Sequence, residues 1–375
     1  MMTNATAWRF GPLDTWFFRE ARGFDTSGSQ ELNSLFPPPA RTLAGAIRTL
    51  IGEQQGVDWK RFAQDGEYAD LKDWIGAGDD LGALRLTGPY PLWQGARLYP
   101  APLHLLAKGK EYRWLTPGAP VACDLGTVRL PALEAPLPGA KPLEQVWLTG
   151  ADLRQVLNGK APNQVFRAGD LYDEEPRLGI ARDNRQRTGI DGLLYQTRHL
   201  RPHDGLAIGA EVRGLPSALQ PVRGMTRFGG EGRSSAVTVT AAPAPLPVPA
   251  PDGQRLLLLL LTPADFGSDW FPPGFRPQQH HGLTVWCGDL HGIPLILHSA
   301  VIGKAAREGG WNLLRQQSRP VKSLIPAGSV FFCSIEGDPR HAVQALHGQH
   351  IGHDTALGRG ELAVGLWRMK EKDET

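Results

Sequence analysis

One stretch, residues 33–52 (NSLFPPPARTLAGAIRTLIG), constrains the fold more than any other. The three prolines at 37–39 fix φ and donate no amide hydrogen, so they predict a stiff, extended segment. A helix is predicted directly after them, with Thr42 as its cap. Its apolar face comprises Leu43, Ala44, Ile47, Leu50 and Ile51. Arg41 would stand at the start of this fixed platform, either as a ligand contact with little freedom left to lose or as a solvated first-turn arginine.

Length and composition set the broad class. A chain of 375 residues favours two domains. The 40 Lys+Arg residues nearly balance the 38 Asp+Glu residues, so only local clusters of charge can argue for a nucleic-acid partner. Cys123, Cys287 and Cys333 are far apart and odd in number, which fits a reducing cytoplasm. The longest apolar run, at 256–261, is shorter than a membrane helix and predicts a buried strand in a soluble, cytoplasmic protein with no membrane partner.

Patterns along the chain predict an α+β fold. Apolar or alternating runs predict strands at residues 8–13, 84–91, 96–108, 146–149, 205–214, 234–242, 255–262, 294–302, 325–335 and 361–367. Helices are predicted at 151–157 and 339–346, a Gly/Pro-punctuated insertion at 108–141, and a Pro/Ala linker at 241–251. Strand, helix, Gly-rich loop and strand follow one another over 325–367, which is the order at the end of a ferredoxin-like βαββαβ unit.

Two basic segments favour a sugar-phosphate partner. In residues 14–24 (DTWFFREARGF), Arg19 and Arg22 lie beside four aromatic residues. Arginine neutralises phosphate and aromatic faces stack on bases, although an aromatic core rimmed by arginine is an equal alternative. Residues 177–202 predict a protruding basic hairpin that could grip a nucleic-acid strand, or else a solvated loop. The arginines of this hairpin chosen as candidate contacts are Arg182, Arg185 and Arg187.

Two Gly-rich loops add further candidates. The loop in 221–233 (PVRGMTRFGGEGR) combines glycines, which allow close backbone approach, with charge, although such a glycine pattern alone is weak evidence for phosphate binding. A second loop at 351–360 (IGHDTALGRG) could lie flat against a backbone, and a basic segment at 304–322 precedes it. The candidates here are Arg227, Gly229, Gly230, Arg233, Lys322, Gly358, Arg359 and Gly360.

Catalytic and metal sites are the weaker alternatives. His280, His281, Cys287 and His291 have ligand types suited to zinc, but no CxxC pair is present, so loop histidines and a buried cysteine are favoured. The histidines at 347, 350 and 353 could act as acid and base in RNA cleavage, but no partner group for the leaving oxygen is visible. We therefore expect no catalytic residue, no cofactor and no metal.

The joint order of several motifs resembles a known family. These are FREARGFD at 18–25, SLFPPPARTLAGAIRT at 34–49, LGIARDNRQRTGIDGLLY at 178–195, RFGGEGR at 227–233, GGW at 309–311 and IPAGSVFF at 325–332. Together with the terminal Gly-rich loop, they are similar to the third subunit of the Cmr complex, the type III-B CRISPR effector. The terminal loop reads G-x5-G-x-G, which is one residue shorter than the usual spacing in the repeat-associated RAMP proteins.

This resemblance implies a fold and a role. It implies two ferredoxin-like, RAMP- or RRM-like domains, which we expect at residues 1–200 and 201–375, with long loop and β-hairpin insertions. The implied subunit is Cas-five-like and non-catalytic, holds the 5′ tag of the guide RNA (crRNA), and braces the large Palm-domain subunit. Backbone RAMP subunits and, indirectly, target RNA are further expected partners. A metal-independent RAMP endoribonuclease that processes CRISPR RNA and a protein scaffold without RNA contact stay as alternatives.

Overall fold

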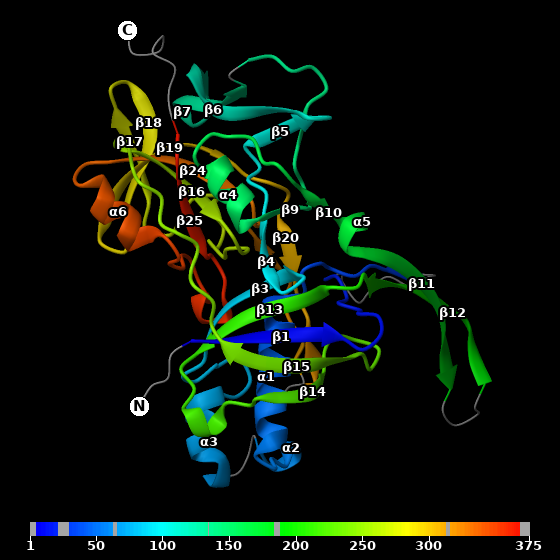
Figure 1. Ribbon diagram of the computed structural model, residues 1–375. Coiled ribbons are helices and arrows are strands. Elements are labelled where there is room, and N and C mark those ends of the chain that lie inside the picture. The colour runs from blue at the N-terminus through cyan, green and yellow to red at the C-terminus, as the bar shows by residue number, and fades with distance from the viewer. Residues whose placement is uncertain are drawn as a thin grey trace.

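Two antiparallel sheets dominate the computed structural model, which describes residues 5–21, 30–62, 66–133, 135–183, 188–312 and 316–367 (Figure 1). The first sheet contains, in spatial order, β10 (Phe166–Arg167), β9 (Val146–Thr149), β4 (Ala96–Pro100), β3 (Arg85–Trp93), β13 (Leu206–Arg213), β1 (Thr6–Pro12), β15 (Ser234–Ala241) and β14 (Arg223–Arg227). The second contains β17 (Arg276–His280), β18 (Leu283–Leu290), β19 (Ile293–Val301), β24 (Val330–Ile335), β16 (Arg255–Leu260) and β25 (Leu362–Leu366). The chain is thus a strand-rich mixture of α and β structure.

Smaller elements surround these sheets. The minor sheets are β7 (Gly126–Leu133), β6 (Glu111–Cys123), β5 (Leu105–Lys108) and β8 (Lys141–Pro142); β11 (Tyr172–Asp183), β12 (Thr188–Pro202) and β2 (Gln30–Leu32); β20 (Ala306–Glu308) and β23 (Lys322–Leu324); and β21 (Trp311–Asn312) and β22 (Gln317–Ser318). The helices are α1 (Ala40–Gln54), α2 (Trp59–Phe62), α3 (Ala69–Ile75), α4 (Gly150–Leu157), α5 (Ala168–Leu171) and α6 (Pro339–Leu346), with 3₁₀ turns η1 (Gly66–Tyr68), η2 (Ser217–Leu219) and η3 (Thr355–Leu357). In the described part of the chain no helix is both long and apolar enough to cross a membrane.

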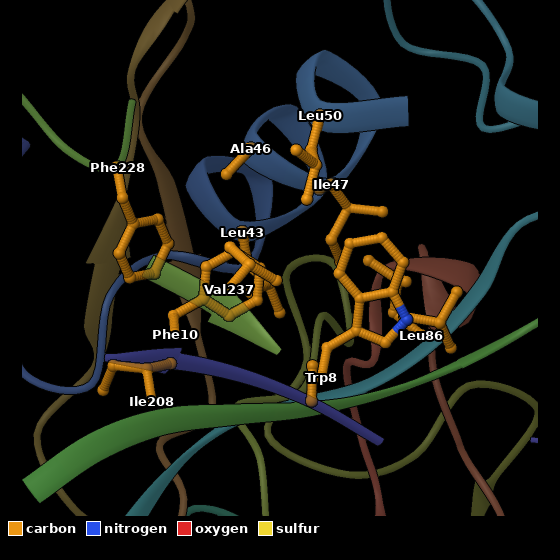
Figure 2. Close-up of a cluster of buried hydrophobic side chains, with 14 of the residues drawn as sticks. Trp8, Phe10, Leu43, Ala46, Ile47, Leu50, Leu86, Ile208, Phe228 and Val237 are labelled. Carbon is orange, nitrogen blue, oxygen red and sulfur yellow. The ribbon is translucent and has the colours of Figure 1, made fainter. Parts of the chain in front are cut away.

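Helix α1 forms the platform expected from the sequence. Its apolar side chains Leu43, Ile47 and Leu50 lie over Trp8 and Phe10 of the first sheet (Figure 2), and all five are at most 3% exposed. Each such buried side chain contributes about 1.5–3 kcal/mol. The expected cap is wrong, because the helix begins at Ala40, Pro39 occupies the N-cap position without a side-chain bond, and Thr42 lies inside the first turn.

The two sheets share one strand order. In the first, β1 lies between β13 and β15, and β3 lies beyond β13. In the second, β16 lies between β24 and β25, and β19 lies beyond β24. In both cases the earliest strand of the unit pairs antiparallel with two strands that come later in the chain. Helix α1 follows the first strand of one unit, and α6 precedes the last strand of the other.

The boundary expected at residue 200 falls inside the first sheet. Strands β13, β14 and β15, all beyond that residue, complete this sheet beside β1 and β3. The basic hairpin was expected to close the first domain, but it is an insertion within the sheet, because the partners of β1 follow it in the chain. The two sheets therefore divide at the Pro/Ala linker, whose residues after Ala241 form no strand until Arg255.

The Gly/Pro-punctuated insertion predicted at 108–141 folds as a small sheet. Strands β5 to β8 pair antiparallel, and β7 packs against β18 and β19 of the second sheet. Val128 of β7 is 3% exposed and belongs to the core of that sheet. Alternating apolar residues in this segment outweigh its prolines, because pairing within the insertion and burial against the second sheet both stabilise extended backbone.

A third core joins the two units. It contains Leu148 and Leu153 from the first unit together with Leu257 and Phe332 from the second, none of them more than 5% exposed. Nearby, Arg97 of β4 binds the Glu361 carboxylate with both terminal nitrogens, with Nη1 to Oε1 at 2.9 Å. Both side chains are largely buried. The units are therefore packed against each other and not merely tethered.

Candidate nucleic-acid interface

The expected basic hairpin is present and projects from the body of the molecule (Figure 1). Strands β11 and β12 pair antiparallel, and β2 adds in parallel through Tyr195, Gln196 and Thr197. Of the candidate contacts, Arg22, Arg185 and Arg187 lie outside the described residues. The backbone of Arg182 lies in β11, but its side chain also falls outside the description.

The base of this hairpin holds a cluster of three arginines around one carboxylate. Asp14 Oδ2 accepts from Arg233 Nη1 at 2.6 Å and Arg177 Nη2 at 3.4 Å, while Oδ1 lies 3.4 Å from Arg201 Nη1. Burial would raise the pKa of Asp14, but the Arg177 hydrogen bond and the three guanidinium charges hold it below its ordinary value. Glu175 binds Arg177 at 2.7 Å and also Arg201. The hydrogen bond from Arg177 lowers the pKa of Glu175.

The first Gly-rich loop packs against this cluster. The Gly230 amide donates to the Phe17 carbonyl oxygen at 2.7 Å, and Gly229 has φ of +100°. A Cβ at Gly229 would lie 2.5 Å from that same oxygen, so glycine here permits contact with the protein itself. Arg227 is exposed at the neck of the loop, opposite Ser234, and Arg233 reaches Asp14.

The aromatic residues beside these arginines are core residues. Trp16, Phe17, Phe18 and Phe228 are at most 3% exposed. The stacking hypothesis is therefore wrong for Trp16, Phe17 and Phe18, which form an aromatic core rimmed by arginine. Phe24, the fourth aromatic residue of this segment, lies outside the described residues. Arg19, on the rim, is exposed and its backbone bridges to Ser34.

The second group of candidates meets where the two units touch, and three of its members are buried. Arg359 is 2% exposed and lies between Glu308 at 3.0 Å, Asp354 at 3.3 Å and Asp265 at 3.5 Å. A guanidinium enclosed in this way cannot reach an RNA backbone, so its expected role as an RNA contact is wrong. A buried arginine at this position instead holds three carboxylates together.

The glycines on either side of Arg359 pack closely against the backbone of this chain itself. Both have positive φ, and a Cβ would lie 2.4 Å from the Gly88 carbonyl oxygen at Gly358 and 1.9 Å from the Ile351 carbonyl oxygen at Gly360. Their expected approach to an RNA backbone is replaced by approach to this chain's own backbone. The loop therefore packs between the two units, with Gly358 against Gly88 of the first unit and Gly360 against Ile351 of the second.

Arg41 and Lys322 lie at the outer side of this network. They share Asp354, at 3.4 and 3.1 Å, while Arg41 also binds Asp79 at 3.1 Å and Lys322 binds Asp265 at 2.7 Å. The bond to Asp265 raises the pKa of Lys322, which is 45% exposed. These two cations remain accessible from solvent.

Two of the three histidines considered for catalysis, His347 and His350, have ring nitrogens that bond to the backbone. His347 Nε2 contacts the Leu246 carbonyl oxygen at 3.1 Å, and its Nδ1 accepts from the Val364 amide; burial lowers its pKa. His350 Nδ1 lies 2.9 Å from the Arg359 carbonyl oxygen. The zinc hypothesis finds no support: among the residues that the structure describes, no three His, Cys, Asp or Glu side chains could together hold a metal ion.

Sequence reasoning named the hairpin stripe but did not select Arg177, Arg201 or Asp14. The sequence did contain a signal for Arg177 and Arg201, because alternate residues along the two strands of a hairpin lie on the same face. Asp173 lies opposite Arg201, and Glu175 lies opposite His199, so these alternate positions at the base of the hairpin share one face. No sequence signal pointed to Asp14. This residue comes close to the three arginines only because β1 pairs with strands that are far away in sequence.

Comparison with known proteins identifies the class to which this fold and basic surface belong. The family described as "CRISPR-associated protein (Cas_Cmr3)" matches residues 8–367, so the chain is a CRISPR-associated protein. In particular, it belongs to the Cmr3 family. No curated protein matches it significantly.

Solved structures support the fold. A chain of the type III-B Cmr-beta complex bound to cognate target RNA is 14% identical, with 96% of each chain covered and a TM-score of 0.50. A chain of that complex bound to cognate target RNA and AMPPnP is 13% identical, covering 88% of this chain and 86% of that one, with a TM-score of 0.49. A RAMP protein described as binding different RNA substrates is 8% identical, covering 98% and 100%, with a TM-score of 0.28. Only the first of these likenesses bears on the fold.

Proposed function

We propose that this chain is a non-catalytic subunit of a type III-B Cmr complex that binds the 5′ tag of the guide RNA and scaffolds its neighbours. The observation that carries the proposal is the solvent-facing arginine cluster at the base of the projecting hairpin, in a chain of the Cmr3 family. Its partners would be the large Palm-domain subunit, the backbone RAMP subunits and, indirectly, target RNA.

The strand orders support this interpretation of the fold. Numbered within each unit, the strands β3, β13, β1, β15 and the strands β19, β24, β16, β25 both run 2-3-1-4. This is the strand order of a ferredoxin-like sheet. Of the two helices in the βαββαβ pattern, α1 is the first helix of one unit and α6 is the second helix of the other. We interpret the chain as two such units, divided at the linker after Ala241.

The chemistry of the surface favours sequence-tolerant binding. Arginine presents a planar fork that pairs with phosphate oxygens, and phosphate contacts position a strand without reading its bases. Arg19 and Arg227 are exposed on the two segments that flank the cluster, and Arg41 and Lys322 are accessible at the contact between the two units. Trp16, Phe17 and Phe18, which were expected to stack on bases, are buried.

A salt titration with the hairpin variant tests the proposal. Binding of a short single-stranded RNA by the pure chain should weaken with salt, with a log–log slope of about 0.7 per phosphate neutralised. Arg182→Ala with Arg187→Ala should weaken binding and lower this slope. The melting temperature should stay unchanged, because the polar sequence around both positions predicts that no core cavity opens, and substitutions outside the core usually move stability by less than about 0.5 kcal/mol. Salt-independent binding would contradict the proposal.

Incubation with CRISPR repeat RNA separates the enzymatic alternative. We expect no cleavage, and His350→Ala and His353→Ala should leave assembly and target cleavage of a reconstituted complex unchanged. Cleavage of repeat RNA by the pure chain, lost on changing one of these histidines, would establish the ribonuclease instead.

A further inference from the structure

We propose that Arg177, Arg201 and Arg233 form a binding site for one phosphate of an RNA strand, and that Asp14 fills this site while no RNA is bound. The inference rests on the proposed function and deepens it. It assigns a subsite to two arginines that sequence reasoning left out, and a competing role to a carboxylate.

The three guanidinium groups converge on one carboxylate from three separate segments of the chain. The three guanidinium groups come from β11, from β12 and from the end of the Gly-rich loop, and they approach both oxygens of a single carboxylate at 2.6–3.4 Å. A phosphodiester also presents two charged oxygens, so it can take the same donors as the carboxylate. The carboxylate of Asp14 marks the place where the phosphate would sit.

The side chains of this cluster are partly exposed, so an RNA phosphate can reach the arginines and replace the carboxylate of Asp14. The side chains of Arg177, Arg201, Arg233 and Asp14 are 30%, 49%, 24% and 46% exposed. The same chemistry is permanent around Arg359, which is only 2% exposed. Water and ions can reach the guanidinium groups of the first cluster but not the guanidinium of Arg359.

The backbone on both sides of the cluster is fixed, so the exchange involves side chains alone. His199, 1% exposed, stacks on Phe17 at 5.0 Å between ring centroids and bonds to Thr15 at 3.0 Å, which fixes the base of β12. Arg233 Nε is fully buried and has no partner among the described residues. Asp14 lies in the bend after β1, next to Leu13, which is 55% exposed.

The charge balance predicts the direction of the effect. Three arginines face the carboxylates of Asp14 and Glu175, so the cluster is only weakly positive while Asp14 is in place. Removing the charge of Asp14 should therefore strengthen RNA binding. We expect roughly a fivefold gain at low salt, the factor that one unit charge at about 4 Å gives in water, and a smaller gain as salt rises.

The experiment compares two variants of equal charge in the full chain. Asp14→Asn and Asp173→Asn each remove one negative charge from the hairpin region, but Asp173 is 73% exposed and its ion pair is with His203. Fluorescence anisotropy with a labelled single-stranded RNA should show the gain for Asp14→Asn and little change for Asp173→Asn. Arg233→Gln should weaken binding and lower the salt slope by about 0.7, and thermal melts check that each variant folds.

The outcomes separate this site from the proposed function. If the wild-type chain binds RNA in a salt-dependent way and Asp14→Asn binds no tighter than Asp173→Asn, the competing role of Asp14 is overturned while the function stands. If no protein binds RNA, the function itself fails and the site fails with it. Inorganic phosphate should displace RNA more effectively than chloride at matched ionic strength, because phosphate offers two charged oxygens to the same guanidinium groups. Equal displacement by the two anions would contradict a built phosphate site.

Discussion

Arginine side chains in this molecule take two roles that burial separates. The guanidinium of Arg359 is enclosed by three carboxylates at the contact between the two units, whereas those of Arg177, Arg201 and Arg233 share one carboxylate at the surface. Removing one partner of a buried ion pair leaves an uncompensated charge, but removing an exposed partner costs little.

Replacing Arg359 with alanine should destabilise the fold. Because Asp265, Glu308 and Asp354 would lose their common partner, we expect a loss of about 3–5 kcal/mol in the free energy of unfolding, measured by urea denaturation. Lys322→Ala is the control, since it removes a 45% exposed partner of two of the same carboxylates and should cost at most about 1 kcal/mol. A stable Arg359→Ala variant that loses RNA binding would restore the expectation from sequence.

A buried histidine should make stability depend on pH. Burial lowers the pKa of His104 to about 3 from an ordinary 6.5, so the unfolded chain binds the proton more readily than the folded one. Stability is complete above pH 6.5 and falls as the pH drops toward 3, by up to about 1.4 kcal/mol per pH unit.

His104→Phe should flatten this dependence, and urea denaturation between neutral and mildly acidic pH measures it. Equal slopes for wild type and His104→Phe would contradict the assignment.

At the scale of elements, α1 contains an unnecessary glycine. Gly45 is exposed in the middle of the helix, and an added Cβ would meet nothing within 4 Å. Gly45→Ala should therefore stabilise the protein by about 1 kcal/mol, the difference in helix propensity, seen as a raised melting temperature. At Gly52 of the same helix a Cβ would lie 2.4 Å from the Trp59 ring, so Gly52→Ala should gain less or lose stability. A loss at Gly45 would contradict this account of the helix.

Elements set by local pattern were predictable from the sequence. The platform helix, the basic hairpin, the Pro/Ala linker and the apolar strand β16 all follow from spacing within a few residues. The position of a strand within a sheet does not, which is why the domain boundary was misplaced. Burial of Arg359 was equally hidden, because its three partners come from separate segments that only the completed fold brings together.

On the scale of the whole molecule, the two units should behave as one. They share an apolar core containing Leu148, Leu257 and Phe332, and the largely buried Arg97–Glu361 pair spans the contact. Burial of this kind distinguishes them from domains that are joined by a flexible tether alone.

Cutting the linker tests this unity. A protease site placed between residues 242 and 254 should allow cleavage without separation, because the shared core holds the fragments together. The nicked protein should elute from a size-exclusion column at the position of the intact chain, and Leu257→Ala, which should remove about 2–5 kcal/mol from the shared core, should weaken this association. Fragments that elute apart from the nicked wild type would show that the linker is what joins the units.

The place of β1 has a consequence for how the protein is made. This strand is synthesised long before both of its partners, because β13 and β15 lie beyond residue 205. At about 5–20 residues per second, the wait for them is roughly 10–40 s. Trp8 and Phe10 therefore stay outside any finished sheet while most of the first unit is still being translated, and the nascent chain depends on chaperones or on early cover by α1 to shield them.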